Sequence, residues 1–208
     1  MALVKYNNNS LSAITSTAGM PAGAMTLIKE QTASSSSTVS FVDGTSDVVL
    51  DSTYPIYLFK FINLHPASDN AQLFVNFSVD TGSNYNVTKT TSVFNATGSE
   101  DGTLGALGYS SGSDLAQGTG TAVLTGDSTV GNGNDECLSG YMYLFGPSST
   151  TFVKHFMVTV NFYELRNRSY EIFTAGYGNT TSAIDAIQFS MSSNIDTGTI
   201  KLYGIKDS

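Results

Sequence analysis

Charged residues are scarce in this chain of 208 residues, because Asp, Glu, Lys and Arg together make up only 12% of it. An average soluble domain has about 25%. Long helices usually expose many charged side chains, so the shortage argues against a helical protein. Ser, Thr, Gly and Asn take the place of the missing charges, and this composition is typical of many strands joined by polar turns.

Basic residues are especially few, with nine Lys and Arg against seventeen Asp and Glu and a net charge of −8. A protein that binds nucleic acid needs a positive patch that neutralises phosphates. The two closest basic residues, Arg166 and Arg168, fit a solvated turn better than such a patch. We therefore expect no nucleic-acid partner.

Side chains that carry chemistry are also rare. The single cysteine, Cys137, excludes a disulfide within the chain, and no His is near it in the sequence, so we expect an unreactive thiol. A hydrolytic triad needs a His beside its nucleophile. The chain has only His65 and His155, and we expect both to be surface or structural residues.

Two pairs of adjacent carboxylates, Glu100–Asp101 and Asp135–Glu136, are the candidates for a glycosidase acid and base. Both pairs lie in Gly-rich segments, where solvated turns are the usual structure, and the chain has no Trp to stack on a sugar. The oxygen donors from Asn132 to Glu136 lack the helix-flanked, twelve-residue spacing of a calcium loop. We expect a turn there, no metal or other cofactor, and no enzymatic activity.

The beginning of the chain differs from the rest. Residues 1–24 show no sustained hydrophobic period and are predicted to form an extended arm, with Leu3, Val4 and Tyr6 as its candidate contact residues. The first ten residues lack the apolar core of a signal peptide, and no stretch approaches the roughly 18 apolar residues of a membrane helix. We expect a protein that is made in a cytoplasm and has no membrane partner.

From residue 25 onward, alternating apolar residues predict strands. Met25–Gln31 and Thr38–Val42 flank four serines and are predicted to be a strand pair with a polar turn. Tyr54–Leu64 is apolar on both faces, so both of its faces can be covered. In Ala71–Val79 the alternation predicts one inward and one outward set: Leu73, Val75, Phe77 and Val79 face inward, and Gln72, Asn76 and Ser78 face outward. Further strands are predicted at 85–94, 140–145, 152–164, 169–175, 184–191 and 197–205.

Residues 95–137 interrupt this pattern with many glycines and only short apolar pieces. We predict a long loop excursion over one end or face of the domain. Loops on a rigid scaffold often carry recognition, so Tyr109, Asn132, Asn134 and Asp135 are candidate contact residues. The whole pattern predicts an all-β fold: a single domain at 25–208 that is an antiparallel β-sandwich of jelly-roll type with an extended N-terminal arm.

The end of the chain resembles a known group of proteins. Tyr177–Thr181, Ile184–Met191 and the Gly-Thr-Ile-Lys-Leu-Tyr-Gly-Ile sequence of 198–205 resemble the ending of many virion proteins of tailed phages, especially marine ones. Met1–Ser10 and Gly23–Gln31 are similar to the same group. The closing segments have a structural role, as two antiparallel core strands. The resemblance implies a jelly-roll-like β-sandwich on a phage particle, and it implies no catalytic residues.

Three functions are weighed on this basis. A head decoration (cement) protein would stabilise the capsid by binding the major capsid protein or other virion proteins through the arm and the sandwich. A tail-fibre or adhesin module would bind host surface glycans through 95–137. A glycan-cleaving enzyme is disfavoured, because no acid and base stand out. We predict a virion structural protein, with decoration ahead of the fibre, and self-association into a homotrimer by analogy with other particle proteins.

Overall fold

The computed structural model describes residues 24–206, which form strands, turns and loops and no helix. No helix of this part of the chain could therefore cross a membrane. The predicted contact residues Leu3, Val4 and Tyr6 lie outside the described residues. The strands are β1 (Met25–Val42), β2 (Ile56–Pro66), β3 (Leu73–Ser78), β4 (Lys89–Ser99), β5 (Gly105–Tyr109), β6 (Ala122–Val123), β7 (Leu138–Phe145), β8 (Lys154–Glu164), β9 (Arg168–Gly178) and β10 (Ala186–Ile205).

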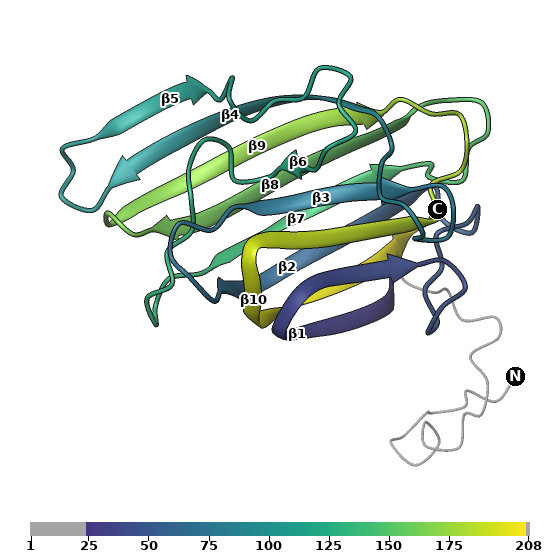
Figure 1. The fold of residues 1–208 in the computed structure, drawn as a ribbon, viewed down its shortest axis with the longest axis horizontal. Coiled ribbons are helices and arrows are strands. Elements are labelled where there is room, and N and C mark those ends of the chain that lie inside the picture. Colours follow the sequence, from purple (N-terminus) through teal and green to yellow (C-terminus); the bar gives the residue numbers. More distant parts are fainter. Residues whose placement is uncertain (1–23, 207–208) are drawn as a thin grey trace, which may run out of the picture.

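All strand pairs are antiparallel, and the strands form one curled sheet in the order β5-β4-β9-β8-β7-β2-β10-β3-β6, with β1 paired to β10 (Figure 1). The prediction of an antiparallel all-β fold is confirmed. The run from β5 to β2 forms a broad surface, which we call the long sheet. The sheet then curls, because β10 continues the long sheet with one half and pairs with β3 through the other half.

The two longest strands bend together at this curl. Residues 195–205 of β10 pair with β2, residues 186–191 pair with β3, and β1 pairs with both halves. The β1–β10 ladder is irregular between Ser36 and Thr38, and Ser35 has a positive φ of 49°. A bulge of this kind bends a strand without reversing it.

Two of the predicted strand pairs are therefore wrong. The four serines at 34–37 form a bend inside β1 rather than a hairpin turn between two strands. The closing segments 184–191 and 197–205 belong to the single strand β10, and its two halves pair with β1 instead of with each other. Polar residues and glycine mark both a turn and a bend, so the sequence pattern did not separate the two.

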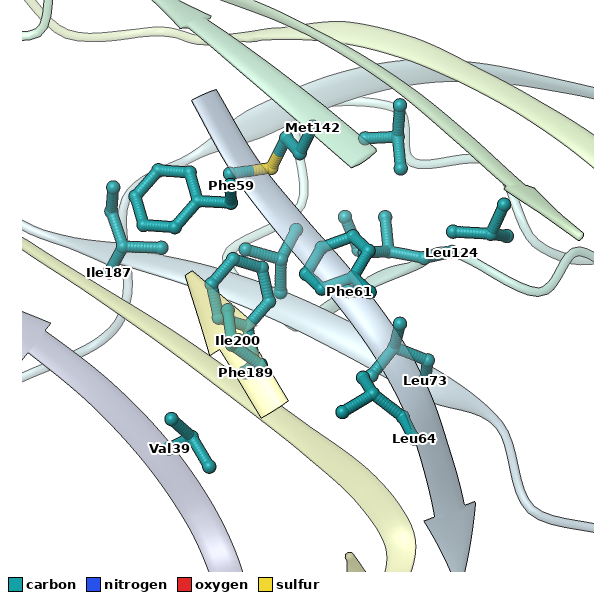
Figure 2. Close-up of a cluster of buried hydrophobic side chains, with 14 of the residues drawn as sticks. Val39, Phe59, Phe61, Leu64, Leu73, Leu124, Met142, Ile187, Phe189 and Ile200 are labelled. Carbon is teal, nitrogen blue, oxygen red and sulfur yellow. The ribbon is translucent and has the colours of Figure 1, made fainter. Parts of the chain in front are cut away.

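The core lies between the inner face of the long sheet and the strands that fold over it (Figure 2). Phe189 of β10 contacts Phe59 and Phe61 of β2, with ring centroids 5.3 and 5.1 Å apart. Phe77 of β3 and Phe156 of β8 have centroids 5.2 Å apart. These edge-to-face contacts, which aromatic pairs prefer, join the two parts of the curled sheet.

The predicted inward residues of the third strand are mostly confirmed. Leu73, Val75 and Phe77 are fully buried. Val79 is 38% exposed, because β3 ends at Ser78. Asn76 and Ser78 were predicted to face outward but are buried, and Asn76 accepts a hydrogen bond from the buried ammonium of Lys89.

Residues 95–137 contain more regular structure than the predicted loop excursion. Residues 95–99 complete β4, β5 pairs with β4, and β6 pairs with β3. Ala122, Leu124 and Val130 are fully buried in the core. A strand of two residues, such as β6, is too short to give a periodic signal, so its pairing comes from tertiary contacts.

Candidate interaction surface

The outer face of the long sheet, turned away from the core, carries apolar side chains. In β7, Met142 and Leu144 point into the core, while Tyr141, Tyr143 and Phe145 alternate with them and point outward. An antiparallel strand with one face in water usually has polar residues on that face. Apolar residues on both faces of β7 are typical of a strand that is covered on both sides.

The strand register places further uncharged side chains of β8 and β9 beside the outward residues of β7. In one row, Tyr141 lies opposite Thr159 of β8, which lies opposite Phe173 of β9. In the next row, Tyr143 lies opposite Met157. We call this surface the aromatic face; it lines a hollow of about 470 Å³. Its residues are Ile56, Phe94, Tyr141, Tyr143, Phe145, Met157, Thr159, Phe173 and Ala175.

Several of these side chains are exposed to an unusual degree. Phe94 is 50% exposed and Met157 is 55% exposed, and no residue of the aromatic face carries a charge. Full burial of such a side chain is worth about 1.5–3 kcal/mol, so a partner that covered the face would gain a substantial free energy. The centres of protein interfaces are rich in aromatic residues and Met and poor in charge. The aromatic face has the composition of such an interface.

Two unpaired charges lie at opposite sides of the aromatic face. Lys60 of β2 lies opposite Tyr141, and its Nζ is 5.1 Å from the ring centroid of Tyr203. Glu171 of β9 lies opposite Asn161 and is exposed. Within residues 24–206 neither charge forms an ion pair.

The structure brings one predicted contact residue to this surface. Tyr109 ends β5, lies opposite Phe94 and is more than half exposed. Its hydroxyl donates a 2.7 Å hydrogen bond to Asp114, and this bond raises the pKa of the phenol. Leu107, two residues earlier on the same side of β5, is 84% exposed. Tyr109 and Leu107 therefore extend the aromatic face to the edge of the sheet.

The other predicted contact residues lie together elsewhere. The backbone N–H of Asn132 donates a 2.9 Å hydrogen bond to Asp69, in the connection between β2 and β3. Asn134 and Asp135 are exposed in the adjacent turn. Tyr109 pairs with Phe94 of β4, whereas Asn132 is bonded to the β2–β3 connection, so the predicted set belongs to two different parts of the fold.

The turn at 131–136 is held by hydrogen bonds of its own. The Glu136 carboxylate accepts a 2.6 Å bond from the Gly133 N–H, and the Gly133 carbonyl lies 3.1 Å from Nε2 of His65. These contacts give His65 a structural role. Residues 24–206 contain no group of three or more His, Cys, Asp or Glu side chains placed to hold a metal ion.

The remaining candidates for chemistry are dispersed. Asp101 accepts hydrogen bonds from Ser99 and Thr103, which lower its carboxyl pKa to about 2 and close a turn. His155 is exposed beside Tyr177 on the outer face. Burial raises the pKa of the Cys137 thiol. Asp101, His155 and Cys137 do not form a common site. Glu100, Asp135 and Glu136 lie near the phenol of Tyr163, and burial together with these carboxylates raises its pKa.

Two buried lysines were missed by the sequence analysis. Lys89 of β4 and Lys154 of β8 lie on either side of Gly178 of β9, on the inner face. The Lys89 ammonium donates hydrogen bonds to Asn76 and to the Val87 carbonyl. Burial lowers the pKa of Lys89 to about 8 and also lowers that of Lys154. Their ammonium groups bind backbone carbonyls of loops, and that of Lys89 also binds the side-chain oxygen of Asn76 on β3, which is a structural role.

Comparisons of the chain with known protein families, with curated proteins and with solved structures found no match. The function is therefore argued from the surface itself. The sequence contains one indication of the aromatic face. The uninterrupted apolar run from Tyr141 to Phe145 predicts a strand that is buried on both faces, as the run at Tyr54–Leu64 does.

Proposed function

We propose that the protein works by contact with other proteins rather than by catalysis, as a structural component of a tailed-phage virion. The observation that carries the contact role is the aromatic face, an uncharged surface of large side chains on the outside of an ordered sheet. A contiguous apolar patch on a folded protein marks an interaction site. The virion assignment rests on the resemblance of the closing strand and the opening residues.

The finer description of the fold belongs to this proposal. We regard the curled sheet as a jelly-roll-type β-sandwich, in which β3, β6 and the paired halves of β1 and β10 are the second layer. The ring contacts between Phe189 and Phe61, and between Phe77 and Phe156, support two facing layers. The extended arm at residues 1–24 lies outside the described residues apart from Ala24.

The place on the particle that we favour is the head, as a decoration (cement) protein. Each copy would contact the major capsid protein through the arm and the sandwich, and many modest contacts would together stabilise the shell. Such a protein is assembled into the virion in the host cytoplasm. The homotrimer, expected only by analogy with other particle proteins, stays a prediction that competes with the two-fold contact inferred below, and the mass of the assembled protein decides between them.

Binding to isolated phage heads, stripped of accessory proteins, tests this function. The full chain is compared with a variant that lacks residues 1–24. Saturable binding at a fixed ratio to capsid subunits, lost with the arm, supports decoration. Absence of head binding overturns it.

The second candidate function is a tail-fibre or adhesin module that binds host surface glycans. The exposed rings of Tyr109 and Phe94, which lie on adjacent strands, favour it, because sugars stack on such rings. Retention of the protein on host cells or their polysaccharide, weakened by Tyr109→Ala, would support this alternative. Equal retention of the variant, or none for either protein, would contradict it.

A further inference from the structure

We infer that the aromatic face joins two copies of this chain about a two-fold axis that runs along the strands, between β7 and β8. The inference rests on the proposed contact function and names its partner as a second copy. It uses two observations: the composition of the face and the positions of its two flanking charges.

The charges are placed symmetrically about the proposed axis. In the strand order β9-β8-β7-β2, Glu171 lies on the first strand and Lys60 on the last. Neighbouring strands are about 4.8 Å apart, so each charge is about 7 Å from the line between β7 and β8. A two-fold rotation about this line exchanges the two sides. It therefore places Glu171 of one copy over the strand that carries Lys60 in the other.

The offset along the strands is within the reach of these side chains. Lys60, Tyr141, Thr159 and Phe173 form one row across the sheet, and Glu171 is two residues from Phe173. Two residues of a strand span about 7 Å, and facing sheets lie about 10 Å apart. The long side chains of Lys and Glu cover that separation. Because the contact is isologous, the ion pair forms twice.

The two charges do not pair within one chain. Their strands are three spacings apart, which is about 14 Å. A partner that carries one sign of charge would leave either Lys60 or Glu171 without a counter-ion. A second copy supplies both signs at once.

Side chains at the centre of the proposed contact are also complementary between the two copies. The same rotation sets Met157 on β8 of one copy over Tyr143 on β7 of the other, and thioether sulfur packs favourably against aromatic rings. The chain has a net charge of −8, so two copies repel one another over most orientations. The uncharged aromatic face lets them approach with little of that repulsion.

A charge-swap experiment on the full chain tests this arrangement. Sedimentation equilibrium over a range of concentrations gives the dimer Kd for the wild type, Lys60→Glu, Glu171→Lys and the double variant. Each single change places like charges together, so we expect the Kd to rise at least tenfold. The double variant restores opposite charges, and its Kd is expected to return to within about threefold of the wild type. Asp47→Lys, an exposed site on the β1–β2 connection, is the control for a change in net charge.

The outcomes separate this inference from the proposed function. A wild type that is monomeric or trimeric at all concentrations overturns the two-fold contact, as does a dimer that the single variants do not weaken or the double variant does not restore. Thermal unfolding of each variant shows whether it is folded. Head binding by the wild type is measured independently, so a monomer that decorates heads overturns the dimer and leaves the proposed function standing.

Discussion

Phe94 and Phe173 stack face to face on the outside of the sheet, with ring centroids 4.9 Å apart and planes 13° from parallel. They come from the neighbouring strands β4 and β9 and are direct partners in the ladder. The stack buries one side of each ring and leaves Phe94 half exposed. A pair of this kind is worth about 0.5–1.5 kcal/mol beyond burial, and the exposed half of Phe94 stays open to a partner.

Two methionines on the adjacent strands β7 and β8 lie on opposite faces of the sheet, so their variants test which face is the core. Met142 points into the core and is fully buried, whereas Met157 points outward. We expect Met142→Ala to lower the free energy of unfolding by about 2–5 kcal/mol, because it leaves a cavity. Met157→Ala should lower it by less than about 1 kcal/mol in dilute solution. Urea unfolding of the two variants checks this, and equal losses would contradict the assignment of the faces.

The ring of Phe189 joins the two parts of the curled sheet. It contacts Phe41, Phe59 and Phe61, with centroids 5.1–6.4 Å apart. Phe189→Ala should therefore cost about 3–5 kcal/mol of stability, measured by urea unfolding. Phe152→Ala is the matched control, since that ring is largely exposed and its loss should be nearly neutral. A small effect at Phe189 would mean that the curl does not depend on this cluster.

The irregular pairing of β10 with β2 between Thr197 and Thr199 depends on a glycine. Gly198 has a φ of 120°, and a Cβ there would lie 2.6 Å from the Asn63 carbonyl oxygen and 2.7 Å from Cα of Leu64. Gly198→Ala should destabilise the protein by about 2 kcal/mol or more, as a melting temperature several degrees lower will show. Gly105→Ala is the control, because no atom lies within 4 Å of its added methyl group. Equal melting temperatures for the two variants would be inconsistent with a close backbone approach that only glycine allows at this position.

Lys89 makes stability depend on pH. Burial lowers its folded pKa to about 8, below the ordinary value of 10.5. Between these pH values the unfolded chain binds more protons than the folded chain, so the free energy of unfolding rises with pH in this window and is insensitive to Lys89 below it. Between pH 7.5 and pH 9.5 we expect Lys89 to raise the free energy of unfolding by about 1–2 kcal/mol, and we expect this rise to be absent in Lys89→Met. Lys60→Met, at an accessible lysine, should keep the wild-type pH dependence in urea unfolding.

Much of the fold could be predicted from sequence, because its strands follow a period of two. The alternation at Leu73–Phe77 and Phe156–Phe162 correctly predicted buried faces. Phe152 was predicted to share the second of these faces, which is wrong, because β8 begins at Lys154 and Phe152 is largely exposed. The bends in β1 and β10 were not predictable in the same way, since serines and glycine accompany bends and turns alike. For β6 the pairing depends on residues far away in the chain.

The candidate site was only partly predictable. Tyr109 was identified from its loop-like context, but it lies on a strand and acts with Phe94, which the sequence did not single out. Asn132, Asn134 and Asp135 were grouped with it by chain proximity, and the structure places them at another connection. The composition of a sheet face depends on which strands are neighbours. Local sequence patterns do not specify that strand order, so the face could not be predicted from them.

The rate at which hydrogen peroxide oxidises Met157 tests most directly whether a second copy of the chain covers the aromatic face. Met157 is exposed in a single copy, and exposed methionines oxidise readily. Peptide mapping gives its rate in dilute and concentrated protein, with buried Met142 as the protected reference. We expect the rate to fall several-fold as concentration rises, and to stay high in Glu171→Lys. An equal rate at every concentration, with wild type and variant alike, would contradict the assignment of this face as the contact between two copies.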